Sequence, residues 1–156
     1  MEIANLELFL GQMLGGVLMM GGNSGQIIYL SSRSAFGRIA ILENAVELAL
    51  VPGPHRKVIE KLVSRAKAIL QKRHDLIHGM WLQRKATGEV LTAKLPYVAG
   101  TEVPISEQYL TDMIRDIRNL IDEIKAQTTL LFEAADRLES RVKRATPTPP
   151  AADKTL

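Results

Sequence analysis

The fold is decided by the stretch from Ser106 to Lys143, which reads SEQYLTDMIRDIRNLIDEIKAQTTLLFEAADRLESRVK. Its apolar side chains recur at alternating steps of three and four residues, which is the period of helices that pack knobs-into-holes. The heptad positions are Leu110, Ile114, Ile117, Ile121, Ile124, Thr128, Leu131, Ala135, Leu138 and Val142. We expect one helix about 55 Å long, at 1.5 Å per residue. It exceeds the other predicted helices, so its far end is expected to meet a partner chain.

Three shorter helices are predicted before this one, over residues 3–20, 31–50 and 54–77. Glycines in the first of them (Gly11, Gly15 and Gly16) would allow another helix to pack closely. The glycine-rich run 21–25 should break the chain after that helix. Ser32 or Ser34 is a suitable N-cap for the second helix, and Gly79 is a stop signal for the third.

A change in character follows at residues 80–98, where apolar residues flank the turn sequence Ala86-Thr87-Gly88-Glu89 and predict a short β-hairpin. Ser106 should then cap the last helix. The predicted fold is an all-α, four-helix bundle with a small β-hairpin before a long C-terminal helix. Residues 1–144 form this domain, and residues 145–156 are expected to be a disordered tail rich in Pro and Thr.

Composition narrows the class of protein. The 156 residues include no cysteine, which removes disulfides and thiolate metal sites and fits a reducing compartment. The most apolar stretch, from Leu8 to Met20, is too short to span a bilayer and follows Glu2 and Glu7 rather than basic residues. We therefore expect a cytoplasmic protein with no membrane partner.

Positive charge is concentrated in one part of the chain. Residues 51–85 carry nine Lys and Arg but only two acidic residues, which gives this segment a net charge of +7. The whole chain has a net charge of only +3, so the rest of it is net negative. Such a patch attracts polyanions, including nucleic acid. The alternative is a solvated helix face with no ligand.

Arg73 is the most informative residue in this basic segment. Wound as a helix, residues 58–77 place their apolar side chains on one face, and Arg73 projects from the middle of that face. A guanidinium stays charged and is costly to desolvate, so it needs a partner or a function. One interpretation is a buried ion pair with Glu43, Glu47 or an acidic residue of the last helix.

The other interpretation is chemical, because His78 follows Arg73 by five residues and His74 shares a helix face with His78. When RNA is cleaved, a base deprotonates the ribose 2′-hydroxyl, which attacks the adjacent phosphorus. Histidine can act as that base or as the acid, and a guanidinium can hold two nonbridging oxygens. No metal or cofactor is needed. A metal bound by His74 and His78 would lack an obvious third ligand.

The segment Arg73-His74-Asp75-Leu76-Ile77-His78 resembles the Arg-x4–6-His signature of the HEPN superfamily. In that family the residue after the arginine is usually Asn, Asp or His, and His74 fits. The resemblance implies a helical bundle that acts as a metal-independent endoribonuclease and homodimer, with the motifs of two copies facing a shared basic cleft. It is similar to ribonucleases of toxin–antitoxin and phage-defence systems, which implies a cognate antitoxin or defence-system partner protein.

On this hypothesis Arg73 stabilises the charge on phosphorus, His78 is the general base or acid, and His74 assists. The RNA backbone would be followed by Lys61, Arg65, Lys72, Arg84 and Lys85. One subgroup of the family carries a modified tyrosine two residues after the histidine, where this chain has Met80. The alternatives are a helical interaction module in which Arg73 is structural, and a nucleic-acid-binding or nucleotide-binding domain without turnover. His55 is expected at the surface, and Trp81 could stack on bases or cover the core.

Overall fold

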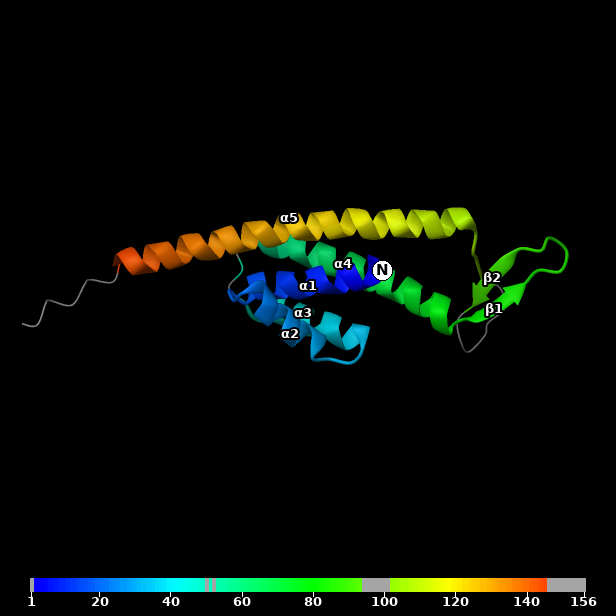
Figure 1. The fold of residues 1–156 in the computed structure, drawn as a ribbon, viewed down its shortest axis with the longest axis horizontal. Helices are drawn as coiled ribbons and strands as arrows, with labels where there is room; N and C mark the ends of the chain where they lie inside the picture. The colour runs from blue at the N-terminus through cyan, green and yellow to red at the C-terminus, as the bar shows by residue number, and fades with distance from the viewer. Residues whose placement is uncertain (1, 50, 52, 94–101, 146–156) are drawn as a thin grey trace, which may run out of the picture.

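The computed structural model describes residues 2–49, 51, 53–93 and 102–145. These residues form five helices and a three-stranded antiparallel sheet (Figure 1). The helices are α1 (Glu2–Val17), α2 (Gly22–Leu30), α3 (Ala35–Leu48), α4 (Gly53–His78) and α5 (Glu107–Ala145). The strands are β1 (Met80–Gln83), β2 (Val90–Ala93) and β3 (Val103–Pro104). The predicted tail beyond Ala145 lies outside the described residues.

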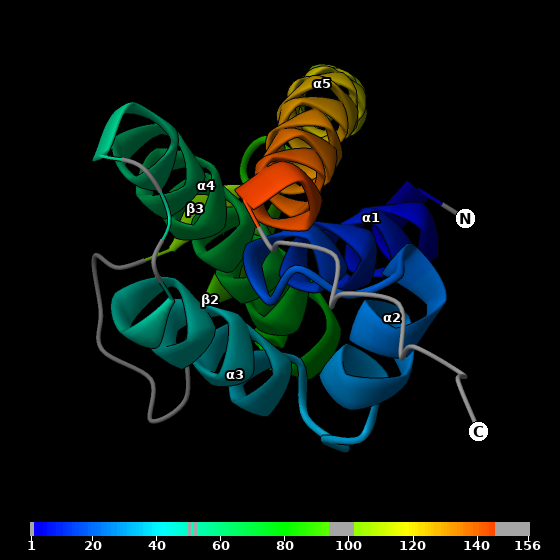
Figure 2. The same cartoon turned by 90° about the vertical axis from the view of Figure 1, so that its left-hand side faces the viewer.

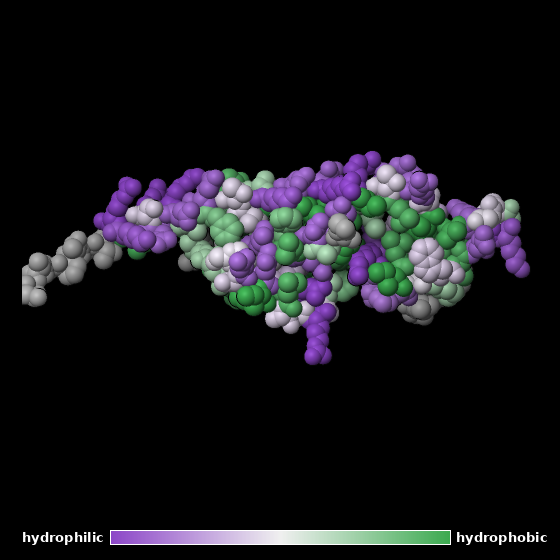
Figure 3. Space-filling view, in the orientation of Figure 1, coloured by the Kyte–Doolittle hydropathy of each residue, from purple (hydrophilic) through white to green (hydrophobic). Residues whose placement is uncertain are grey.

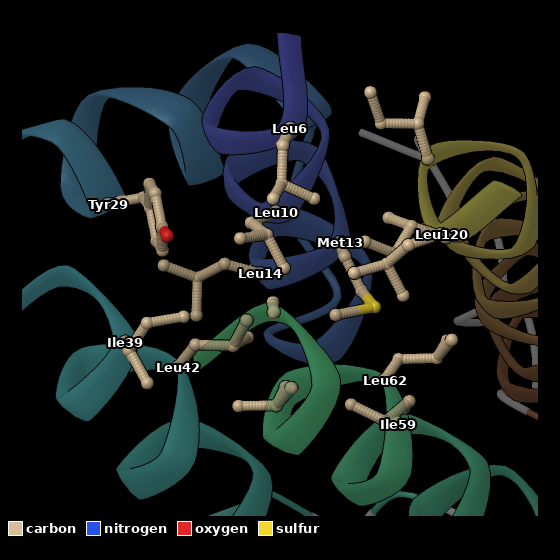
Figure 4. Packing of buried hydrophobic residues seen from close by; sticks show 14 of the residues in the cluster. Leu6, Leu10, Met13, Leu14, Tyr29, Ile39, Leu42, Ile59, Leu62 and Leu120 are labelled. Atoms are coloured by element: carbon tan, nitrogen blue, oxygen red, sulfur yellow. The ribbon is translucent and has the colours of Figure 1, made fainter. Parts of the chain in front are cut away.

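The molecule is elongated, with the sheet at one end and the last turns of α5 projecting at the other (Figure 1). Helix α1 lies between α5 on one side and α2 and α3 on the other, as the view along the molecule shows (Figure 2). Its residues Leu6, Leu10, Met13 and Leu14 are fully buried, and they face side chains of all the other helices (Figure 4). The helical bundle is therefore organised around α1.

Helix α5 confirms the long heptad helix. The Ser106 hydroxyl accepts a hydrogen bond from the Tyr109 N–H at 3.0 Å, which is the predicted N-cap. The central heptad positions, from Ile117 to Leu131, are buried in the core. Both ends of the seam extend past the bundle, so Leu110 and Leu138 are each about two-fifths exposed, at 40% and 44%. The outer side of the helix is hydrophilic along its length (Figure 3).

The expectation of four helices was wrong, because Gly22 begins a further helix within the run that the sequence marked as a break. The reason lies at Gly25, which packs against the backbone of α1. A Cβ at Gly25 would lie 2.2 Å from the Gly15 nitrogen and 2.5 Å from the Gly11 oxygen. The glycines of α1 thus do permit close packing, and the glycine of α2 completes the contact.

The turn between α1 and α2 is a Schellman motif. The N–H of Met20 donates to the carbonyl of Gly15 at 2.9 Å, and the N–H of Met19 donates to that of Gly16 at 3.2 Å. Met19 has a φ of 55°, the left-handed conformation that this motif normally gives to glycine.

No single described helix is long and apolar enough to cross a membrane, whereas α1 and α2 pass that test together as a pair bent by 118°.

The remaining predicted elements are confirmed. Ser34 caps α3 by accepting from the Gly37 N–H at 2.9 Å. The hairpin pairs Trp81 with Thr92, and residues 94–98 of the predicted range lie outside the described residues. Strand β3 was not predicted, because two residues that include a proline give no periodic signal.

An ion pair joins α1 to α3 beside the buried Tyr29. Arg38 donates from Nη2 to Glu7 Oε1 at 2.5 Å and from Nη1 to the Ser32 carbonyl at 3.0 Å. Both charged side chains are largely buried. Arg38 is therefore a structural arginine that fixes the loop before α3.

Candidate active site

Arg73, His74 and His78 lie in the last turns of α4, where that helix runs past the other helices toward the sheet (Figure 1). The buried face of α4 ends at Leu70. Arg73 and Ile77 continue the same face by helical period, but both are exposed, Ile77 to 53%. Arg73 thus occupies the apolar stripe as predicted, at a point where the stripe has already left the core.

Arg73 makes no ion pair within the described residues. Of the carboxylates considered for it, Glu43 binds Lys67 at 2.9 Å. Glu123 of α5 binds Arg65 at 2.5 Å. The interpretation of Arg73 as half of a buried ion pair is therefore not supported, and its guanidinium is available to a ligand.

The two histidines of the motif form a ring pair on the exposed side of α4. Their ring centroids lie 4.7 Å apart with the planes tilted by 47°. On its other side His74 meets the ring of Phe36 from α3, edge to face, at 6.0 Å. We call the exposed residues Arg73, His74, Ile77 and His78 the motif face.

The geometry of the motif face limits what one copy can do. Residues five apart leave an α-helix about 140° apart around its axis. Arg73 and His78 therefore diverge, with Ile77 between them. A second copy could place its histidine near the arginine of the first.

The sheet holds the last turn of α4 in place. The indole N–H of Trp81 donates to the Leu76 carbonyl at 3.0 Å, and the Thr92 hydroxyl donates to the Asp75 carbonyl at 3.3 Å. The Trp81 bond satisfies a carbonyl of the last turn, where a helix leaves such groups without intrahelical partners, and the Asp75 carbonyl also accepts from the Gly79 N–H at 2.9 Å. Gly79 allows this close approach, since a Cβ there would lie 2.5 Å from the Thr92 hydroxyl oxygen.

Asp75 is the acidic residue of the motif segment, between His74 and His78. Its carboxylate accepts a hydrogen bond from Gln71 Nε2 at 2.7 Å, one turn earlier on α4. The side chain is half-buried on the opposite side from the motif face. Asp75 therefore belongs to the support of the last turn.

The residues predicted to bind the RNA backbone fall into two groups. Arg65 and Arg84 form ion pairs, the latter with Glu89 at 2.6 Å. The second group consists of three exposed lysines that make no ion pair within the described residues, Lys61, Lys72 and Lys85. Partners from α3, from the turn before β2 and from α5 thus reduce the positive charge that the sequence concentrates in residues 51–85.

Two further features lie outside the motif face. His55, expected at the surface, is half-buried, and its Nδ1 lies 2.9 Å from Nε2 of the buried Gln127 on α5. A groove of about 430 Å³ runs between α3 and α4, near the start of α4. Acidic and basic side chains alternate around it, including the Glu43–Lys67 and Arg56–Glu60 ion pairs.

Phe36 is the neighbour of the motif that the sequence did not reveal, because it is distant along the chain and no spacing connects it to His74.

Within the described residues, no three His, Asp or Glu side chains gather as metal ligands would. Comparisons with protein-family models, curated proteins and solved structures found no match to this chain. Function is therefore inferred from the residues of the motif face and their surroundings.

Proposed function

We propose that this protein is a metal-independent endoribonuclease of HEPN type that acts as a homodimer. The observation that carries the proposal is the exposed Arg73, without an ion pair in the described structure, beside the exposed ring pair of His74 and His78. A structural arginine in this protein is bonded and largely buried, as Arg38 is. Arg73 is neither, which favours a role toward a ligand.

The apolar surface around the motif face supports a dimer. Ile77 continues the buried face of α4, and Leu110 and Ile114 continue the buried seam of α5. All three are at least 40% exposed, at the end of the molecule where both helices leave the core (Figure 1). Hydrophobic atoms also surface beneath the N-terminal half of α5 (Figure 3). A second copy related by a two-fold axis would cover these residues and bring two motif faces together.

In the resulting site, His78 removes the proton from a ribose 2′-hydroxyl, and the oxygen attacks the adjacent phosphorus. Arg73 donates to the nonbridging oxygens as negative charge builds on them. A second imidazole, from His74 or from the other copy, protonates the departing 5′ oxygen. The products are a 2′,3′-cyclic phosphate and a 5′-hydroxyl. Lys72 is exposed but leaves α4 on the side away from His74 and His78, so it lies outside this site.

The test is cleavage of single-stranded RNA by purified variants. We expect His78→Ala and Arg73→Ala each to lower the cleavage rate at least a hundredfold, on the order of the loss seen when an acid–base group or charge-stabilising donor is removed. Because both side chains are exposed, the melting temperature should change by less than about 2 °C. Arg38→Ala is the matched control, and it should lower the melting temperature instead.

The same assay run in excess EDTA tests the metal-independent mechanism. Cleavage should persist there, and the 3′ ends should carry cyclic phosphate. Unfolding of Arg73→Ala, together with no cleavage by the wild type, would show that Arg73 is structural after all. Loss of activity in EDTA alone would reject the metal-independent mechanism.

A further inference from the structure

Trp81 is the sole tryptophan of the chain, and it lies three residues beyond His78. It is 52% exposed, yet its indole N–H is tied to the Leu76 carbonyl at 3.0 Å. That bond fixes the ring beside the last turn of α4, within one helical turn of His78. A large aromatic ring is thus held at the C-terminal end of α4 while half of its surface remains open.

The strand pairing shows which side of the sheet carries this ring. Residues that pair across antiparallel strands share a face. Trp81 pairs with Thr92, and Gln83 pairs with Val90. Trp81, Gln83 and Val90 are exposed, with only Thr92 buried among them. The opposite face is half-buried or buried throughout, and it carries Met80, Leu82, Leu91 and Ala93. Trp81 therefore belongs to the open face of the sheet and is not part of the core.

We propose that Trp81 stacks on an unpaired nucleobase of the RNA whose phosphate is bound at Arg73 and His78. This inference rests on the proposed function in that RNA is the ligand. Aromatic side chains bind bases that are splayed out of a single strand, because bases in a duplex already stack on one another. The stack would make the site selective for single-stranded RNA. Arg84 and Lys85 follow in the chain and are exposed toward the same end of the molecule.

The tryptophan fluorescence of the wild-type protein, excited at a wavelength that tyrosine does not absorb, reports on this ring alone, because no other tryptophan is present. The probe is a short single-stranded RNA with 2′-O-methyl riboses, which lacks the attacking hydroxyl and so is not cleaved. We expect saturable quenching by this probe. An abasic strand with the same backbone and a duplex of the same sequence should both leave the fluorescence nearly unchanged.

Substitutions of Trp81 distinguish stacking on a nucleobase from a role in covering apolar side chains of the protein. Binding of a fluorescently labelled probe, measured by anisotropy, should weaken on the order of 10- to 100-fold in Trp81→Leu, which removes the ring. Trp81→Phe keeps a ring and should bind within a few-fold of wild type. Leu48→Ala, an 84% exposed residue at the opposite end of α3 from Phe36, is the control and should bind as wild type.

The outcomes distinguish this proposal from the nuclease proposal. Wild-type cleavage with an unchanged KM in Trp81→Leu would overturn stacking and leave the nuclease intact. Saturable quenching by a protein that cleaves no RNA would support stacking and overturn the nuclease. If Trp81→Leu instead converts a dimer to a monomer in sedimentation, the ring belongs to the subunit interface and stacking is wrong.

Discussion

Arg38 and Arg73 show how two identical side chains come to lie in different surroundings. Each lies at one end of the apolar face of its helix, Arg38 before the buried residues of α3 and Arg73 after those of α4. Arg38 lies where three helices meet, and it bonds to Glu7 and to the Ser32 carbonyl. Arg73 lies beyond the last turn that the bundle covers. The position of the covering helices, rather than the local pattern, decides which arginine is structural.

Tyr29 provides a test of the packing around Arg38. Burial, assisted by the negative charge of Glu7, raises the pKa of this phenol well above its ordinary value of 10.0. The unfolded chain ionises first, so the stability from keeping Tyr29 neutral is complete below about pH 10 and falls as the pH rises beyond it. Between about pH 8 and pH 11 the wild type should lose about 1.4 kcal/mol more than Tyr29→Phe.

Urea denaturation of both proteins at the two pH values measures this difference. The double comparison cancels the titration of the lysines and of the other tyrosines, which both proteins share. Equal losses in the two proteins would mean that the Tyr29 hydroxyl reaches solvent in the folded state.

Among the elements, α3, α4, α5 and the hairpin were predictable because each combines a clear period with capping or turn residues. Helix α2 was not. Its sequence, Gly22-Asn23-Ser24-Gly25, has the composition of a loop, and only contact with the glycines of α1 makes a helix favourable there. Tertiary packing thus overrides local propensity.

Gly25→Ala tests this contact. A methyl group would meet the α1 backbone at 2.2 Å, so the two helices must separate. We expect a loss of about 2 kcal/mol in the free energy of unfolding, after the gain in helix propensity that alanine brings. Gly22→Ala, in the same helix, meets only ordinary contacts at 3.6 Å and should be neutral or slightly stabilising. Urea denaturation compares the two, and equal effects would reject the proposed role of Gly25.

The candidate site was predictable in its residues and not in its surroundings. Helical period placed Arg73 on the buried face of α4, and proximity in sequence grouped it with His74 and His78. Period gives the side of a helix but not the residue at which its neighbours stop covering it. For the same reason, no spacing in the chain indicated that Phe36 would meet His74 or that Glu123 would bind Arg65.

At the scale of the whole molecule, the two ends of α5 offer competing surfaces for a second copy. Leu110 and Ile114 are exposed beside the sheet, and Leu138 is exposed to a similar degree at the projecting end. The heptad pattern alone favoured the projecting end. The motif face favours the sheet end, because a site formed by two copies requires contact there.

Charged substitutions distinguish the two ends. Leu110→Glu combined with Ile114→Glu should raise the dimer dissociation constant at least on the order of 100-fold and abolish RNA cleavage, since like charges would face each other across the interface. Leu138→Glu is the matched control and should remain a dimer. Sedimentation velocity gives the result for each. A monomeric Leu138→Glu beside a dimeric double variant would place the interface at the projecting end.

The central position of α1 has a consequence for synthesis. Its buried leucines are covered by the segment of α5 from Ile117 to Leu131, about a hundred residues later in the chain. At 5–20 residues per second, the ribosome takes roughly 5 to 20 seconds to deliver that segment after α1 has emerged. During this interval the uncharged run from Leu8 to Ser32 lacks its contacts with α5. We expect the apolar surface that α5 covers to stay exposed on the nascent chain until this last helix arrives.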